Sequence, residues 1–165
     1  RLEVVRFDQE VEDALFFDLV GFSGYLQDSG TSASDGIEFS GTITVSEFLN
    51  FSTNYTHNET ERPNDMQRLR RPEQLANFGI NFTSSSEKFR LSAFYRVSRD
   101  SVDEQFGSRV DLDDFEVLDI SASYRISENI SLYARLENAL DETYQEVLDF
   151  ISPDRASYIG IRLNF

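Results

Sequence analysis

Apolar and polar residues alternate one by one through most of this chain, and the alternation recurs in eight separate segments. Successive side chains of a β-strand point to opposite faces, so a period of two predicts strands with one apolar and one polar face. The segment 37–45 is typical, because its apolar residues are Ile37, Phe39, Ile43 and Val45. The eight predicted strands lie within residues 2–16, 37–45, 49–56, 76–82, 88–97, 117–126, 130–138 and 158–165.

The connections between these strands alternate between short and long. Those between 45 and 49, between 84 and 88 and between 126 and 130 leave room only for a tight turn. None of the connections has the apolar pattern of an amphipathic helix, which excludes a βαβ fold. We therefore predict an all-β, antiparallel up-and-down meander with its tight turns at one end. The long connections, at the other end, are 17–31, 60–73, 100–113 and 139–155.

Alternation alone does not decide which face of the sheet lies inside. A small soluble barrel fills its interior with apolar residues, whereas a membrane barrel turns them towards lipid. Two observations favour the membrane barrel: the strands run to about ten residues, as a tilted crossing of a bilayer requires, and the aromatic residues of the apolar face gather near strand ends, as in interfacial girdles. These aromatic residues are Phe51, Tyr55, Phe82, Phe89, Tyr124 and Phe165.

The C-terminal stretch YIGIRLNF, residues 158–165, is a third observation in favour of a membrane barrel. Its apolar alternation continues to the last residue, so no polar tail follows the strand. A bare apolar edge strand in water invites mispairing, whereas the same strand in a closed barrel is paired. The chain also begins at Arg1 in mid-pattern, without an initiator methionine, and we interpret it as a piece of a longer protein.

Composition and charge narrow the possible functions. The formal net charge of −15 argues against nucleic acid as a partner, which requires basic stripes. The chain has no cysteine and one histidine, His57, so thiolate sites are impossible and most imidazole-ligated metal centres are excluded. Nothing in the sequence would activate a serine nucleophile. We therefore predict a protein that is not an enzyme and has no cofactor.

Carboxylates are concentrated in the last two long connections. Oxygen ligands of this kind could hold Ca²⁺, but no twelve-residue calcium loop is present, and we favour a solvated, repulsive loop surface. These residues are Asp100, Asp103, Glu104, Asp111, Asp113 and Asp114 in one connection and Asp141, Glu142, Glu146, Asp149 and Asp154 in the other.

The C-terminal stretch also resembles the assembly signal of bacterial outer-membrane proteins, which the barrel-assembly machinery recognises. Gly160, Leu163 and the terminal Phe165 match that signal. Tyr158 stands where the signal usually has a polar residue, which is a mild departure.

Further upstream, the chain resembles the TonB-dependent outer-membrane receptors. The stretch RLENALDETYQ at 135–145 is similar to a motif near the end of these receptors, and RRPEQLANFGINF at 70–82 is similar to their Arg-Pro start of a strand. The stretch VVRFDQEVEDALFFD at 4–18 resembles the cobalamin and siderophore branch. The matching residues are Asn138, Leu140, Asp141, Tyr144, Arg71 and Pro72.

This resemblance implies a barrel of about 22 strands with a globular plug in its lumen. Residues 1–165 would supply the last eight strands and their outer loops, while the N-terminal plug would be absent from this segment. The implied partners are outer-membrane lipid and lipopolysaccharide, the receptor's own plug, TonB acting through the plug, and the barrel-assembly machinery. The implied location is the Gram-negative outer membrane. The residues expected to face the lumen are Glu38, Arg90, Arg96, Asp119, Arg125, Arg135, Glu137 and Arg162.

Two alternatives stay open at this point. Eight strands are enough to close a complete small outer-membrane barrel. A soluble β-barrel that carries an apolar ligand would show the same alternation, and its solubility without detergent would distinguish it from both membrane barrels.

Overall fold

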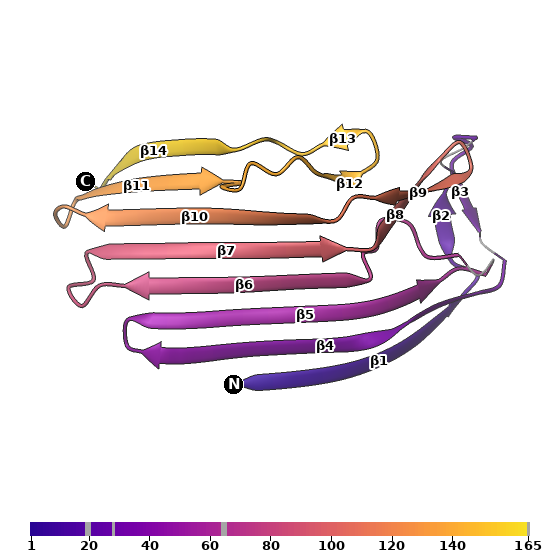
Figure 1. The fold of residues 1–165 in the computed structure, drawn as a ribbon, viewed down its shortest axis with the longest axis horizontal. Coiled ribbons are helices and arrows are strands. Elements are labelled where there is room, and N and C mark those ends of the chain that lie inside the picture. The colour runs from indigo at the N-terminus through magenta and orange to yellow at the C-terminus, as the bar shows by residue number, and fades with distance from the viewer. Residues whose placement is uncertain (19–20, 28, 64–65, 165) are drawn as a thin grey trace.

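The computed structural model describes residues 1–18, 21–27, 29–63 and 66–164, so Phe165 of the predicted assembly signal lies outside the described residues. Eight long strands form one antiparallel sheet in the order β1-β4-β5-β6-β7-β10-β11-β14 (Figure 1). Their bounds are β1 Leu2–Glu12, β4 Thr31–Ser46, β5 Leu49–Glu61, β6 Gln74–Thr83, β7 Phe89–Arg99, β10 Phe115–Arg125, β11 Ile130–Glu137 and β14 Ala156–Leu163.

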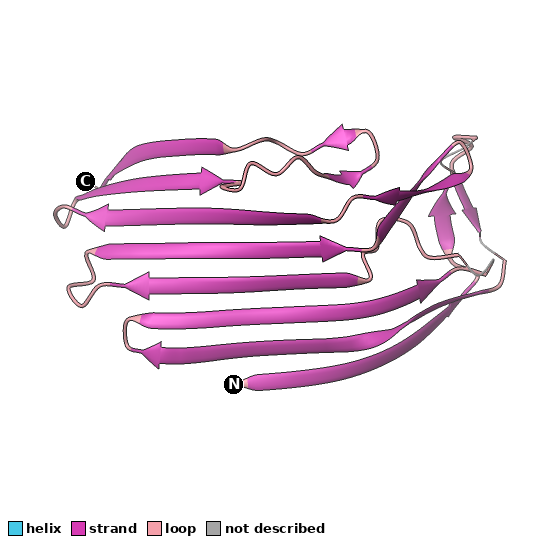
Figure 2. Ribbon diagram, in the orientation of Figure 1, coloured by secondary structure: helices cyan, strands magenta, loops and turns pink. Residues whose placement is uncertain are grey.

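The meander predicted from the sequence is confirmed. Each long strand pairs with the next long strand along the chain. Tight turns join β4 to β5, β6 to β7 and β10 to β11 at one end of the sheet, which we call the turn end (Figure 2). The four long connections lie at the opposite end, the loop end.

The long connections contain structure that the sequence pattern did not predict. Three of them fold into short hairpins, and β4 and β5 extend beyond their predicted bounds to Thr31 and Glu61. Both faces of these extensions carry polar residues, so no hydrophobic alternation marks them. The hairpins are β2 Leu15–Phe17 with β3 Tyr25–Gln27, β8 Ser101–Gln105 with β9 Ser108–Leu112, and β12 Gln145–Val147 with β13 Phe150–Ile151.

The strand register separates an apolar face from a polar face. Directly paired residues of antiparallel strands lie on the same face. One row of paired residues is apolar and consists of Phe39, Tyr55, Ala76 and Val97. The adjacent row lies on the polar face and consists of Ser40, Asn54, Asn77 and Arg96.

The sheet has no conventional hydrophobic core. Among the described residues, the buried apolar side chains are Val102, Leu112, Phe115 and Val117, all at the loop end. The apolar face of the sheet is largely exposed instead: Leu2 is 68% exposed, Ile159 is 86% exposed and Ile161 is 63% exposed. A surface this apolar requires a cover of lipid or protein.

The sheet is open. β1 and β14 each pair on one side only within the described chain, which is the arrangement of a segment of a larger barrel. Within the same described residues there is no helix of sufficient length and apolar character to cross a membrane.

Candidate ligand-binding loops and polar face

Asp103 links three of the long connections at the loop end. Its side chain is fully buried, with 0% exposure, although it lies in β8 of a loop hairpin. The Nε–H of Arg70, from the connection between β5 and β6, donates to both carboxylate oxygens at 3.1 Å. The backbone N–H of Leu148, between β12 and β13, donates to Oδ2 at 2.8 Å, and that of Glu104 donates to Oδ1 at 2.9 Å. One carboxylate thus holds three loop segments together.

The surroundings of Asp103 determine its charge state. Burial would raise the pKa of this carboxyl, but the amide hydrogen bonds of Leu148 and Glu104 and the bond and charge of Arg70 outweigh burial and lower the pKa below its ordinary value. Asp103 is therefore ionised at neutral pH. The prediction of a solvated loop surface is wrong for this residue.

A cavity of about 270 Å³, which is lined by Arg70, lies between the connection from β5 to β6 and the first loop hairpin. We call it the arginine cavity. The Arg62 guanidinium lies 5.4 Å above the centre of the Phe16 ring. The Arg68 backbone N–H donates to Thr60 Oγ1, and this hydrogen bond ties the connection between β5 and β6 to the end of β5. Its basic lining residues are Arg62, Arg68, Arg70 and Arg71.

The arginine cavity is suited to an anion. Within the described chain, the side chains of Arg68 and Arg71 form no ion pair, although the protein carries a net charge of −15. Arginine binds carboxylate and phosphate groups through paired hydrogen bonds. The sequence contained a signal for this site, because residues 62–71 hold four of the fifteen Lys and Arg residues, but the motif resemblance identified only Arg71.

Asn138 of the receptor motif organises the last long connection. Its backbone is left-handed (φ 47°), a conformation that asparagine tolerates better than most residues. Its buried side-chain amide donates to the carbonyls of Glu142 and Pro153 and accepts from the Glu142 N–H. Its own backbone N–H donates to Asp119 at 2.9 Å. Asn138 therefore has a structural role in the turn after β11.

The other motif residues have different surroundings. Asp141 forms an ion pair with Arg155 at 2.9 Å, whereas Leu140 is 49% exposed. The Tyr144 ring lies 4.4 Å from the Phe115 ring, measured between centroids. The Arg96 guanidinium lies 5.2 Å from the Phe115 centroid and 5.8 Å from that of Tyr144. Tyr144 thus packs the last loop against the polar face of the sheet.

Arg71 and Pro72 lie in the connection that leads into β6, as predicted. The Arg71 carbonyl accepts a hydrogen bond from the Gln67 side chain at 3.1 Å, and Arg71 also lines the arginine cavity.

All the residues expected to face a lumen share the polar face of the sheet. The register places Arg90 beside Ser123, and Arg125 in one row with Ser131 and Arg162. That this face lines a lumen stays a prediction. The remaining members of the set, found on the same face by their register, are Glu38, Arg96, Asp119, Arg135 and Glu137.

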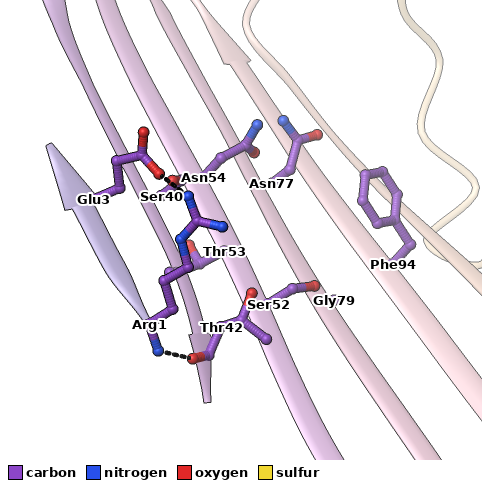
Figure 3. A pocket seen from close by; sticks show the side chains of 11 residues that line it. Arg1, Glu3, Ser40, Thr42, Ser52, Thr53, Asn54, Asn77, Gly79 and Phe94 are labelled. Atoms are coloured by element: carbon purple, nitrogen blue, oxygen red, sulfur yellow. Dashed lines mark hydrogen bonds and ion pairs between the residues drawn. The ribbon is translucent and has the colours of Figure 1, made fainter. Parts of the chain in front are cut away.

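The polar face differs between its two halves. On β1 and β4 to β7 it forms an open hollow of about 500 Å³, lined by hydroxyl and amide side chains and by the Phe94 ring (Figure 3). The charges in this hollow are those of Arg1 and Glu3, which form an ion pair at 2.8 Å. On β7 to β14 the polar face carries arginines instead. The neutral polar side chains of this face that line the hollow are Ser40, Thr42, Ser52, Asn54 and Asn77.

Gly160 of the predicted assembly signal has a visible packing role. It pairs with Tyr133 across β11 and β14, and a Cβ at this position would collide with the Tyr133 ring. Tyr158 shares the polar face with Gly160, while Leu163 pairs with Ile130 on the apolar face. Recognition of these residues by assembly machinery stays a prediction.

An open antiparallel meander with one apolar face and structured loops at one end has the architecture of a wall segment of a larger β-barrel. Residues 3–139 match the family described as TonB dependent receptor-like, beta-barrel, and the chain belongs to this family. Proteins of this family reside in the outer membrane of Gram-negative bacteria, which is the location of this chain.

Sequence identity to individual relatives is low. The vitamin B12 transporter BtuB of Photobacterium profundum is 27% identical over 101 residues, which is 61% of this chain and 16% of the transporter. The pyoverdine receptor FpvA of Pseudomonas aeruginosa PAO1, bound to pyoverdine, superposes with a TM-score of 0.80 at 16% identity, over 98% of this chain and 27% of the receptor. The siderophore receptor PiuA of Acinetobacter baumannii gives 0.76 at 15% identity, over 98% and 26%.

The two structures share the fold of this chain, and neither decides its ligand. The chain spans about a quarter or less of the length of these relatives. All three are receptors or transporters rather than enzymes.

Proposed function

We propose that this chain is the C-terminal barrel portion of a TonB-dependent receptor that imports a large, scarce ligand of the siderophore-iron or cobalamin class. Family membership, the superposition on siderophore receptors and the similarity to a vitamin B12 transporter support this proposal. The alternatives of a complete small barrel and a soluble carrier have no support in the open sheet and its exposed apolar face.

In the proposed mechanism, the loop end captures the ligand outside the cell. Energy from the inner membrane reaches a plug in the lumen through TonB, and the plug then releases the ligand inwards. This segment contributes barrel wall, four outer connections and the assembly signal, while the plug and its TonB contact belong to other parts of the receptor. The apolar face contacts the lipid of the outer membrane, with lipopolysaccharide around the loops.

The arginine cavity is the observation that carries ligand capture. Its arginines favour an anionic chelate over a ligand without acidic groups. Asp103 holds Arg70 in place and connects the cavity to two further loops, so capture at this site is linked to the loop cluster. A siderophore chelate with carboxylate or catecholate groups is therefore the favoured member of the proposed class.

Ligand uptake by the full-length receptor tests this proposal. Cells that express it are offered ferric catecholate, ferric pyoverdine and labelled cyanocobalamin, with and without a functional TonB. We expect TonB-dependent uptake of an anionic ferric chelate, reduced about tenfold by combining Arg68→Gln with Arg71→Gln, since two charge-assisted contacts are lost. Arg6→Gln, on the opposite face of the sheet, is the matched control. Uptake of cyanocobalamin alone, unchanged by the double substitution, would contradict the role of the cavity.

A further inference from the structure

The hollow on β1 and β4 to β7 contains an aromatic ring that does not cover its cross-strand glycine. Three aromatic residues of the polar face pair directly with a glycine: Phe7 with Gly36, Tyr133 with Gly160 and Phe94 with Gly79. A Cβ at Gly36 or Gly160 would collide with the paired ring, so those two rings lie over their glycines. The side chain nearest to Gly79 is instead that of Ser52, and Phe94 is 48% exposed. The Phe94 ring is therefore available to a ligand in the hollow (Figure 3).

Two asparagines of the same hollow are available as well. Asn54 and Asn77 pair directly across β5 and β6, one row closer to the loop end than Gly79. Within the described residues, neither side chain forms a hydrogen bond. The other asparagines on the polar side of β5 and β6 each accept one from a cross-strand hydroxyl group, at 2.7 to 2.8 Å: Asn50 from Thr44, Asn58 from Ser34 and Asn81 from Ser92. A side-chain amide has two donors and an acceptor, so this pair offers both kinds of group to a ligand.

The charge of the hollow limits the ligands that fit it. The charged residues in its lining are Arg1 and Glu3, and they pair with each other at 2.8 Å. An ion would find no free opposite charge there, and desolvation of an unpaired ion is unfavourable. A wholly apolar ligand would leave the two asparagine amides without partners. The lining therefore favours a neutral ligand that has hydroxyl groups and one apolar surface.

We propose that this hollow binds the ring of a neutral sugar. One face of such a ring consists of C–H groups and stacks on Phe94, while the hydroxyl groups at its edge bond with Asn54 and Asn77. Neighbouring strands are about 4.8 Å apart, so β5 and β7 are about 10 Å apart, which gives space for one six-membered ring beside Gly79. The inference goes beyond the proposed function, because the arginine cavity favours an anion and this hollow favours a neutral group.

Saturation-transfer NMR of the full-length receptor, in a detergent without sugar head groups, tests this site. The probes are maltotriose, cellotriose and chitobiose. We expect transfer to the protons of at least one of these sugars, and Phe94→Leu should weaken its binding about tenfold, since stacking is lost. Phe94→Tyr keeps the ring and should bind like the wild type. Phe78→Leu, at an equally exposed position on the opposite face, is the matched control.

A second variant tests the polar part of the site. Combining Asn54→Ala with Asn77→Ala should also weaken sugar binding about tenfold, because hydrogen bonds from both amides are lost. Asn81→Ala is its control, since the Asn81 side chain already bonds with Ser92, and it should leave sugar binding unchanged.

Each outcome supports or overturns the sugar site. Heat-modifiable migration in gels establishes first that each variant folds, and the asparagine variant provides the comparison if Phe94→Leu does not. Absence of transfer to all three sugars overturns the proposal, and so does transfer that persists unchanged in the Phe94→Leu and asparagine variants. If the receptor binds a sugar at this site but imports no ferric chelate or cobalamin, the proposed function fails and the sugar site stands. Import without sugar binding has the opposite meaning.

Discussion

Single residues hold the loop end together. Asp103 and Asn138 are polar residues in the loops, and both are buried with their hydrogen-bonding groups satisfied. Each connects backbone or side-chain groups from segments that are distant along the chain. Because a buried polar group that loses its partners carries the full cost of desolvation, these two residues are sensitive positions for substitution.

Asp103 gives a prediction for the pH dependence of the loops. Its pKa is lowered in the folded state, so its stabilising effect is complete above the unfolded pKa of about 3.9 and is lost as pH falls through the lower folded value. We expect hydrogen exchange of the Leu148 amide to remain slow from neutral pH down to about pH 4. Asp103→Asn should accelerate exchange of the Leu148 amide throughout that range, because the substitution removes about 2 kcal/mol of local protection. Asp113→Asn, an exposed acid of the same connection, is the control; equal effects of both substitutions would contradict the buried role.

Asn138 gives a second prediction at this scale. Asn138→Ala removes the hydrogen bonds to Glu142 and Pro153 and places an alanine at positive φ, with an expected loss of about 2 to 4 kcal/mol. Urea unfolding of the receptor in detergent measures this loss. Asn129→Ala, at the exposed turn between β10 and β11, should change stability by less than about 0.5 kcal/mol. A wild-type midpoint for Asn138→Ala would show that its hydrogen bonds do not stabilise the loop.

At the scale of elements, register determines which residues act together. A shift of one residue would move the arginines of the polar face to the apolar face, so the register of β11 and β14 is strongly specified. The Tyr133 ring over Gly160 is one feature that depends on this register. The same glycine belongs to the predicted assembly signal. A requirement for Gly160 therefore has two candidate causes, which are packing against Tyr133 and recognition by the assembly machinery.

A double substitution separates these two causes. Gly160→Ala is expected to reduce the folded, heat-modifiable fraction in the outer membrane, because the added methyl group displaces the Tyr133 ring. Tyr133→Ala removes the collision, so the double variant should recover, with a coupling energy of about 1 kcal/mol. If the double variant stays as defective as Gly160→Ala, direct reading of the glycine by the assembly machinery explains the defect instead.

At the scale of the whole molecule, the location of apolar surface is the decisive property. The described residues bury few apolar side chains, while one face of the sheet exposes residues such as Leu2 and Ile161. A net charge of −15 keeps the loops and the polar face hydrated but does not cover that apolar face. We therefore expect the sheet to be stable only where lipid or detergent covers this face.

Detergent dependence is the prediction at this scale. Purified segment 1–165 should aggregate in buffer and remain dispersed in detergent micelles or vesicles, as measured by sedimentation. In vesicles, a lipid-soluble quencher should reach probes at Ile159 and Ile161 and fail to reach probes at Ser121 or Ser123 on the polar face. A monodisperse segment in plain buffer, with the arginines around an apolar interior, would contradict the membrane assignment.

The sequence predicted the strands well and the loops poorly, for a physical reason. Alternation marks a strand only where its two faces meet different surroundings, as in β6 and β7. Where both faces are polar, as at Thr31 and Glu61, the strands continue without any hydrophobic signal. In the same way, Asp103 belongs to an acidic stretch that resembles exposed loop, and nothing nearby in sequence marks its burial.

The sequence by itself determined the meander, the two unlike faces and the residues that each face carries, because strand periodicity is a local property of neighbouring side chains. The tertiary structure alone decided the arginine cavity and the buried position of Asp103. Arg70 and Leu148 are 33 and 45 residues from Asp103 along the chain. Contacts of this kind depend on strand order and on how loops fold back, which no period in the sequence encodes.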